Sequence, residues 1–269
     1  MVPIGAAVTD GYNAGHGLPF DSEGMKERYP DIFFSQFTGA ELVADKWNLS
    51  REDLDQFALE SHQKAAHATE SQYFDREILP VEGKNAEGIN DLVMADEGIR
   101  FDASLDKLAG LNPVTEGGKI TAGNASQITD GAAAVLICND AGLKKIKSNP
   151  RAEIVSISVV GDDPVFMLTG PIPASHKALD IAKLSIDDMD IYEVNEAFAP
   201  VPLAWAEELK ADRSKLNVNG GAMALGHPLG ATGAKLMTTM LHELERRKGK
   251  YALQAICEGG GTANATIIK

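Results

Sequence analysis

Three side chains in the last third of the sequence could carry out acid–base chemistry together. His227 lies in a glycine-rich stretch, Cys257 is closely followed by three consecutive glycines, and Asn195 follows a short apolar run. An imidazole with a pKa of about 6.5 and a thiol with a pKa of about 8.5 are a matched base and acid near neutral pH. A carboxamide and the backbone N–H groups of a glycine turn can donate hydrogen bonds to an oxyanion. These residue types therefore suit proton transfer next to a carbonyl group.

Each of the three residues also has a plain structural interpretation. Asn195 could cap a helix or belong to a turn. Residues 257–262 could be a tight turn between the last two strands. His227 is harder to explain by packing alone, because it stands between Gly226 and Pro228. The chemical interpretation therefore depends on the three side chains meeting in space.

The elements that must position these residues follow from the hydrophobic pattern after residue 150. Short apolar runs alternate with helical patterns there, which predicts an α/β domain with helices packed on a sheet. The reactive residues come just after predicted strands, and open α/β sheets bind ligands beyond the carboxyl ends of their strands. The expected strands span residues 153–160, 191–194, 216–218, 251–256 and 263–268, and the expected helices span residues 174–184, 198–209 and 235–248.

The sequence before residue 150 shows fewer regular elements. Residues 1–36 are polar and interrupted by Gly and Pro, and we expect them to be loop. A helix is expected over residues 39–47. A capping-box-like start at Ser50 then predicts an amphipathic helix over residues 51–70. Loops with short extended pieces are expected from residue 71 to residue 120.

Composition excludes several classes of protein. The 269 residues carry a formal net charge of −14, which argues against a general nucleic-acid or anionic-membrane surface. The longest apolar run, residues 132–138, is far shorter than the roughly 20 residues of a membrane span and predicts a fully buried strand. His62 and His67 lie five positions apart, off the spacing that places two ligands on one helix face, and we predict no metal site. Two cysteines, Cys138 and Cys257, indicate a reducing compartment, and we place the protein in the cytoplasm.

Five segments together resemble the thiolase family. Residues 195–199, 217–233 and 257–262 are similar to its three C-terminal signatures in order and spacing, and residues 121–131 and 170–174 match two further stretches. The resemblance implies an α/β, thiolase-like layered fold, in which two similar halves are joined by a loop domain. On this match, residues 1–128 are the loop domain, residues 129–149 close an N-terminal half that is mostly absent, and residues 150–269 are the complete C-terminal half.

The resemblance also implies an activity, the exchange of acyl groups between a 3-ketoacyl-CoA and coenzyme A. His227 would deprotonate the nucleophile and, with Asn195 acting through a water, polarise a thioester oxygen. Cys257 would move a proton to or from the substrate, and the N–H of Gly259 would complete a second oxyanion hole. Coenzyme A would be a substrate, with no permanently bound cofactor. The residues expected to contact it are Ser126, Met167, Phe198, Ala122 and, near the nucleotide, Arg100.

The chain departs from the family pattern in two places. Thiolases carry their nucleophilic cysteine in the N-terminal half; here Cys257 already has the acid–base position, and Cys138 falls inside an apolar run. We therefore expect the chain alone not to complete the acyl-enzyme step. It would be either a truncated thiolase or one subunit of a split thiolase, with the N-terminal half on another chain, and we expect an oligomer. Gln36 and Phe37 replace a His-Met pair of biosynthetic members, which favours a degradative enzyme. The alternative is a non-catalytic subunit that binds acyl-CoA.

Related enzyme classes fit the sequence less well. A decarboxylating condensing enzyme would have two histidines where this chain has Asn195 and Cys257. A nucleotide-dependent dehydrogenase would show Gly-x-Gly-x-x-Gly after an early strand, and the sequence has no such motif there.

Overall fold

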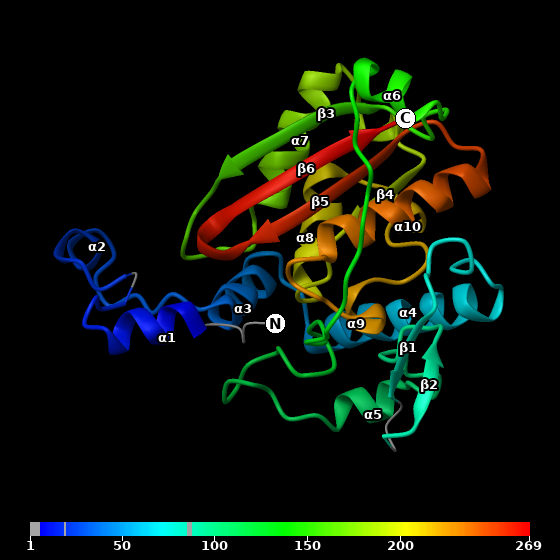
Figure 1. The fold of residues 1–269 in the computed structure, drawn as a ribbon. Coiled ribbons are helices and arrows are strands. Elements are labelled where there is room, and N and C mark those ends of the chain that lie inside the picture. Colours follow the sequence, from blue (N-terminus) through cyan, green and yellow to red (C-terminus); the bar gives the residue numbers. More distant parts are fainter. Residues whose placement is uncertain (1–5, 19, 85–87) are drawn as a thin grey trace. The chain divides into compact units, whose positions relative to one another are not determined.

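The computed structural model describes residues 6–18, 20–84 and 88–269 and contains two compact units, Met1–Ser35 and Gln36–Lys269. Figure 1 shows the helices and strands of both units. The smaller unit has two short helices, α1 (Ala6–Asn13) and α2 (Glu23–Arg28). The prediction of loop over residues 1–36 is therefore wrong in part. The hydroxyl of Ser22 accepts a hydrogen bond from the N–H of Met25 and starts α2.

The larger unit is built on a four-stranded sheet in the order β3-β6-β5-β4. Its strands are β3 (Ile154–Gly161), β4 (Ile191–Val194), β5 (Ala252–Glu258) and β6 (Thr262–Ile268). Strands β4 and β5 are parallel, and the other two pairs are antiparallel. The predicted layered α/β fold is confirmed. The expected strand over residues 216–218 is reduced to isolated bridges, one of them between Tyr192 and Leu216.

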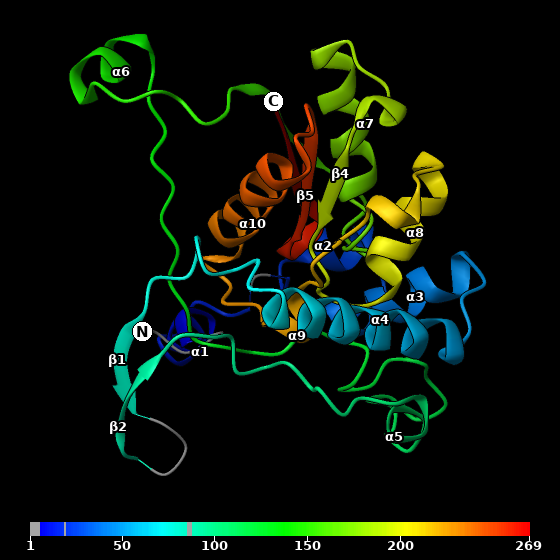
Figure 2. The same ribbon diagram turned by 90° about the vertical axis from the view of Figure 1, so that its right-hand side faces the viewer.

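Helices cover both faces of this sheet (Figure 2). One face carries α7 (Pro171–Ala182) and α8 (Pro200–Leu209), and the other carries α10 (Thr232–Arg247). Proline at the first position fits the start of α7 and α8, because proline has no N–H that needs a partner there. Met240 and Leu244 of α10 pack against residues of the sheet in one buried cluster. This burial holds α10, and with it the loop before it, on the sheet.

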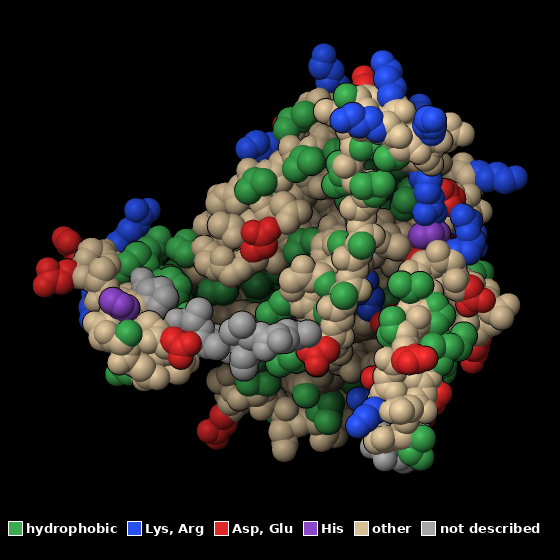
Figure 3. Space-filling view, viewed as in Figure 1, with side chains coloured by type: hydrophobic (Ala, Val, Ile, Leu, Met, Phe, Trp, Pro, Cys, Tyr) green, Lys and Arg blue, Asp and Glu red, His purple; other side chains and the backbone are tan. Residues whose placement is uncertain are grey.

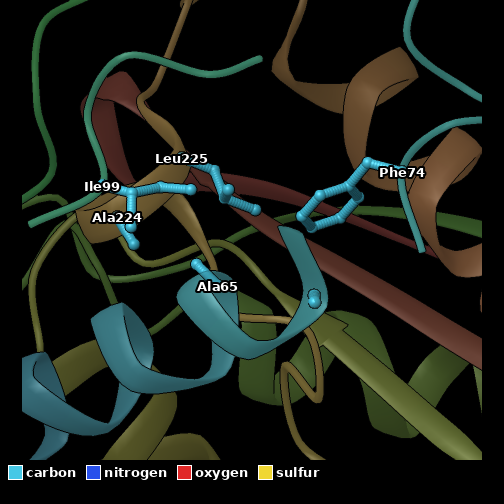
Figure 4. Packing of buried hydrophobic residues seen from close by; sticks show 6 residues of the cluster. Ala65, Phe74, Ile99, Ala224 and Leu225 are labelled. Atoms are coloured by element: carbon cyan, nitrogen blue, oxygen red, sulfur yellow. The ribbon is translucent and has the colours of Figure 1, made fainter. Parts of the chain in front are cut away.

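A long helix from the first half of the chain packs beside the loop that carries His227. Helix α4 (Arg51–Glu70) begins with the predicted capping box, in which Ser50 and Asp53 bond to each other's backbone N–H groups. It lies against the short helix α9 (Ala222–Leu225). Figure 4 shows the contact, a buried apolar cluster of Ala65, Ala68, Phe74, Ile99, Ala224 and Leu225. The cluster therefore fixes the position of residues 224–225, just before His227.

The remaining elements of the larger unit are short, apart from α3 (Gln36–Lys46). None of the helices in the described part of the chain is both long enough and apolar enough to cross a membrane. The described residues also contain no group of three His, Cys, Asp or Glu side chains arranged to hold a metal ion. The short elements are the hairpin β1 (Val81–Lys84) and β2 (Asn90–Val93), helices α5 (Leu105–Ala109) and α6 (Asp140–Ile146), and 3-10 turns at Ile186–Asp188, Arg213–Lys215 and Gly259–Gly261.

The prediction of a buried strand over residues 132–138 is wrong. These residues form no strand, and Leu136 and Ile137 are 77% and 67% exposed. Hydrophobic side chains lie at the surface along this extended segment, which leads into α6 (Figure 3). A strand requires a hydrogen-bonded neighbour, and this segment pairs with none of the four strands of the sheet. The apolar run therefore lacks a partner among the described residues, although its composition is that of a core strand.

Candidate active site

His227 stands in a loop between α9 and α10 that is held from several sides. Gly226 before it has a φ of +81°, and a side chain there would collide with Thr129. The N–H of His227 donates to the carbonyl of Gln127 at 3.0 Å. The side-chain amide of Gln127 in turn donates to the carbonyl of Met223 at 2.6 Å. The segment 127–129 lies within the stretch 121–131 that resembles the thiolase family, and it supports this loop.

Hydrogen bonds define which ring nitrogen of His227 carries the proton. Its Nδ1 lies 2.6 Å from Oγ1 of Thr232, and that hydroxyl donates its only proton to the carbonyl of Pro228 at 3.0 Å. With that proton on the Pro228 carbonyl, Thr232 accepts from Nδ1–H, and the amide Nδ2 of Asn195, 3.4 Å from Nε2, fits the same tautomer, in which Nε2 is unprotonated. Burial lowers the pKa of His227 and favours the neutral ring. The imidazole is thus a base whose free lone pair has a defined direction.

Asn195 lies where β4 ends, and its side chain reaches His227. Its N–H donates to the carbonyl of Ala255 on the neighbouring strand, and its Nδ2 lies 3.4 Å from Nε2 of His227. The side chain is 1% exposed, and its Oδ1 has no hydrogen-bond partner among the described residues. The carboxamide therefore belongs to the same site as the imidazole.

Glu196, next to Asn195, supports the site in a way that the sequence analysis missed. Its buried carboxyl group accepts hydrogen bonds from the hydroxyl of Ser61 at 2.7 Å, from Nδ2 of Asn217 at 2.9 Å and from the N–H of Met223 at 3.1 Å. It thereby joins α4, the end of β4 and the glycine-rich loop. The sequence signal that could have revealed it is a glutamate inside a stretch of small and apolar residues, where a charged side chain is expected only if it has partners.

Cys257 lies near the end of β5, where the strand leads into the Gly259–Gly261 turn. The thiol is free and only 8% exposed. Burial raises the pKa of Cys257 to about 12, and the adjacent Glu258 adds to the shift. The thiol therefore keeps its proton at neutral pH and can act as a proton donor.

A cavity of about 340 Å³ brings the reactive groups together. His227, Cys257, Gly259 and Met167 of the predicted site residues line it. The other lining residues are Gln36, Leu168, Ala197, Leu229, Thr232, Gly233, Ile256, Glu258 and Asn264. A polar acid–base pair is thus surrounded by a largely apolar wall, an arrangement typical of small-molecule sites.

The other predicted binding residues lie outside the lining of this cavity. Phe198 is buried with its ring 5.4 Å from that of Phe37, and the N–H of Ser126 donates to the carbonyl of Ala197, itself a lining residue. Ala122 and Arg100 are exposed. The backbone N–H of Arg100 donates to Nδ1 of the buried His62 at 3.1 Å. Contacts of these four residues with coenzyme A remain predictions.

Comparisons with known proteins agree in one family. A model described as "Thiolase, N-terminal domain" matches residues 18–141, and one described as "Thiolase, C-terminal domain" matches residues 148–269. The steroid 3-ketoacyl-CoA thiolase FadA6 of Mycobacterium tuberculosis is 54% identical over 270 residues, covering 100% of this chain and 65% of that protein. The acetyl-CoA acetyltransferase of Shinella zoogloeoides is 43% identical, covering 100% of this chain and 69% of that protein.

Solved structures show the same similarity. The crystal structure of human mitochondrial 3-ketoacyl-CoA thiolase matches with a TM-score of 0.83 and 46% identity over 86% of this chain and 58% of that one. The same human enzyme in complex with CoA matches with a TM-score of 0.79 and 45% identity, over 86% and 57% of the two chains. The chain thus spans 65% of the length of the mycobacterial relative and 58% of the human structure.

Proposed function

This chain belongs to the thiolase family, and we propose that it supplies the acid–base part of a site that exchanges acyl groups between a 3-ketoacyl-CoA and coenzyme A. The observation that carries the proposal is the cavity shared by the His227 imidazole and the Cys257 thiol, with Asn195 Nδ2 3.4 Å from His227 Nε2. The names of the mycobacterial and bacterial relatives support this reaction class.

In the proposed reaction, His227 removes a proton from the nucleophile. Its Nε2 is the nitrogen that accepts this proton, because Nδ1 lies against the hydroxyl of Thr232. A neutral, buried imidazole can accept a thiol proton and leave a thiolate to attack the 3-keto carbon of the substrate. His227, with Asn195 acting through a water, also polarises the thioester oxygen of the substrate.

Cys257 provides the second proton transfer. When the bond between C2 and C3 of the substrate breaks, its electron pair remains on C2 as an enolate, and the thiol gives its proton to that carbon. A thiol that remains protonated at neutral pH suits this step. The N–H of Gly259, on the cavity wall, is our candidate donor in the second oxyanion hole, for the negative oxygen that forms on the 3-keto carbon; one such donor typically contributes about 3 kcal/mol.

The acyl-accepting thiol is not supplied by the two cysteines of this sequence. Cys257 already serves as the acid, and Cys138 is exposed on the unpaired segment and does not line the cavity. We propose that this thiol comes from a thiolase N-terminal half on another chain, in an oligomer. The exposed apolar run at residues 132–138 supports such a partner, because strands of this composition are normally covered on both faces.

We propose that the substrate is a bulky 3-ketoacyl-CoA and that the reaction runs toward cleavage. Met167, Leu229 and Ile256 give the cavity an apolar wall, and Gln36 closes one part of it. The mycobacterial relative's name refers to a steroid 3-ketoacyl-CoA, which supports the same substrate class. Coenzyme A enters as a substrate rather than as a resident cofactor, with the five residues predicted above as its contacts. Two free cysteines fit a reducing compartment, and we propose the cytoplasm.

Two measurements with the purified chain test the proposal. Calorimetric titration with coenzyme A should give binding, and a thiolysis assay with a 3-ketoacyl-CoA and coenzyme A should give no turnover until a thiolase N-terminal half is added. Robust turnover by the chain alone would show that the acyl-accepting thiol is present after all. If coenzyme A binds neither to the chain alone nor to the chain with the added N-terminal half, the proposal of an acyl-CoA site is contradicted.

A further inference from the structure

Two buried side chains beneath α10 have oxygen atoms without hydrogen-bond donors. Glu193 lies within β4, is 1% exposed, and neither of its carboxyl oxygens has a partner in the described chain. Gln254 lies within β5, is 3% exposed, and its Oε1 is likewise without a partner there. A buried polar atom without a partner typically costs about 1–3 kcal/mol, so three such atoms in one place call for an explanation.

The sheet register places these two side chains next to each other. Glu193 and Gln254 are directly paired across the parallel strands β4 and β5, and paired residues project from the same face of a sheet. That face is the one covered by α10, because Nε2 of Gln254 donates to the carbonyl of Gly233 at 3.2 Å. An ionised carboxylate and an amide oxygen are both acceptors only. A proton on Glu193 turns the same two groups into a donor and an acceptor.

The charges around Glu193 favour the protonated form. Glu196 faces it from the end of its own strand, Glu77 from the segment after α4 and Glu243 from α10, while the cation Lys64 of α4 acts in the opposite direction. Burial raises the pKa of Glu193 well above its usual range, and the three carboxyl groups raise it further. One N–H of the Lys64 ammonium group donates to the carbonyl of Leu216, and none of them bonds to the Glu193 carboxyl group.

We propose that Glu193 is a neutral carboxylic acid that donates a hydrogen bond to Oε1 of Gln254. This bond completes a hydrogen-bonded chain from Glu193 through Gln254 to the carbonyl of Gly233. Gly233 lies in the first turn of α10, directly after Thr232, whose hydroxyl orients His227. Glu193 and Gln254 are thus positioning residues for the start of this helix. The inference is independent of the acyl-transfer reaction proposed above.

Infrared difference spectroscopy on the protein at pH 7 tests the inference. The carbonyl stretch of a protonated carboxyl group should be present in the unchanged protein, weaker by one group in Glu193→Gln, and unaltered in Glu207→Gln, which changes an exposed glutamate. In Gln254→Met the band should remain but move to the frequency of a carboxylic acid without an acceptor. A Glu193→Gln spectrum with the same protonated-carboxyl band would overturn the proposal. If Glu193→Gln does not fold, the Gln254→Met spectrum decides, and an unmoved band there contradicts the hydrogen bond.

The pH dependence of unfolding gives a second readout that a purely structural role would not change. The folded chain would keep the Glu193 proton at pH values above about 4.5, where the unfolded chain has lost it. Stability from this group is therefore complete below that pH and is lost as pH rises toward the raised folded-state pKa. The unfolding equilibrium constant of the unchanged protein should rise by up to about tenfold per pH unit relative to Glu193→Gln. Parallel profiles would show that Glu193 is ionised in the folded state.

Discussion

The hydroxyl oxygen of Thr232 lies 2.6 Å from Nδ1 of His227, and the same hydroxyl donates to the carbonyl of Pro228. A threonine five positions along the chain thus favours the tautomer of the histidine in which Nδ1 carries the proton and Nε2 can accept one. The relationship depends on α10 beginning at Thr232, because the first turn of that helix brings the hydroxyl back over the loop.

Replacing Thr232 by valine should release the imidazole from this tautomer. The shape of the side chain is kept, but Nδ1–H loses its acceptor, which typically costs about 1–3 kcal/mol for a buried donor. Nitrogen-15 NMR of the ring should then show a mixture of tautomers instead of one. Thr238→Val is the matched control on the same helix, because that hydroxyl bonds only to the carbonyl of Ala234. A single, unchanged tautomer in Thr232→Val would contradict the assignment.

Replacing Ser61 by alanine should weaken the fold through Glu196. The serine hydroxyl donates to the Glu196 carboxyl group at 2.7 Å and accepts from the N–H of Gly221 at 3.1 Å, so two buried groups lose a partner. We expect the free energy of unfolding to fall by about 2–4 kcal/mol, measured by denaturant titration. The exposed Ser148→Ala should change it by less than about 0.5 kcal/mol. If the two substitutions lowered the free energy of unfolding equally, the hydrogen bonds of Ser61 to Glu196 and Gly221 would not stabilise the fold, contrary to our account.

Glu77 should make stability fall as pH rises through the mildly acidic range. Burial raises the pKa of Glu77 to about 7, partly offset by a hydrogen bond from Thr239. Between pH 4.5 and about 7 the folded chain holds a proton that the unfolded chain releases, so this contribution is complete below that window and lost across it. Glu77→Gln should flatten the profile by about 1.4 kcal/mol per pH unit within the window, whereas the exposed Glu82→Gln should not. If the dependence of stability on pH kept its slope in Glu77→Gln, the proton released in this window would belong to another group.

Replacing Leu136 by lysine should reduce self-association without lowering thermal stability. The side chain is 77% exposed on the unpaired segment, so a charge there removes apolar surface and disturbs no packing. Light scattering should show less association, and the melting temperature should stay the same. Leu179→Lys is the contrast, because Leu179 is 6% exposed and a charge there should destabilise the fold severely. A large loss of stability in Leu136→Lys would mean that the segment is packed.

Local patterns allowed much of the fold to be predicted from the sequence. The capping box at Ser50 and the apolar spacing after it located α4 at Arg51–Glu70, and the alternation after residue 150 located all four strands of the sheet. The apolar run at residues 132–138 has the composition of a strand, but strand formation depends on a neighbour that the run itself does not encode. Helix α2 of the smaller unit begins at a single cap, Ser22, which a polar, glycine-rich composition obscured.

The candidate site was predictable where residue type alone carries chemistry. His227, Cys257 and Gly259 share one cavity, and Asn195 adjoins His227. The supporting residues were not found, because their roles depend on long-range pairing. The role of Thr232 at His227 depends on where helix α10 begins. Glu196 is defined by partners on α4 and in the loop, and the pairing of Glu193 with Gln254 exists only in the register of two strands 61 positions apart.

The most direct test of the acid–base site is hydrogen exchange at the α-carbon of an acyl-CoA in deuterated water. This step requires no acyl-enzyme, so the chain can be assayed alone by mass spectrometry. We predict that the chain catalyses the exchange and that two substitutions each slow it by at least about 100-fold while coenzyme A still binds. Cys257→Ser removes the thiol that carries the proton, and His227→Gln removes the imidazole that polarises the thioester oxygen. Binding without exchange, or exchange at the same rate in both variants, would contradict the account and leave a non-catalytic acyl-CoA-binding protein.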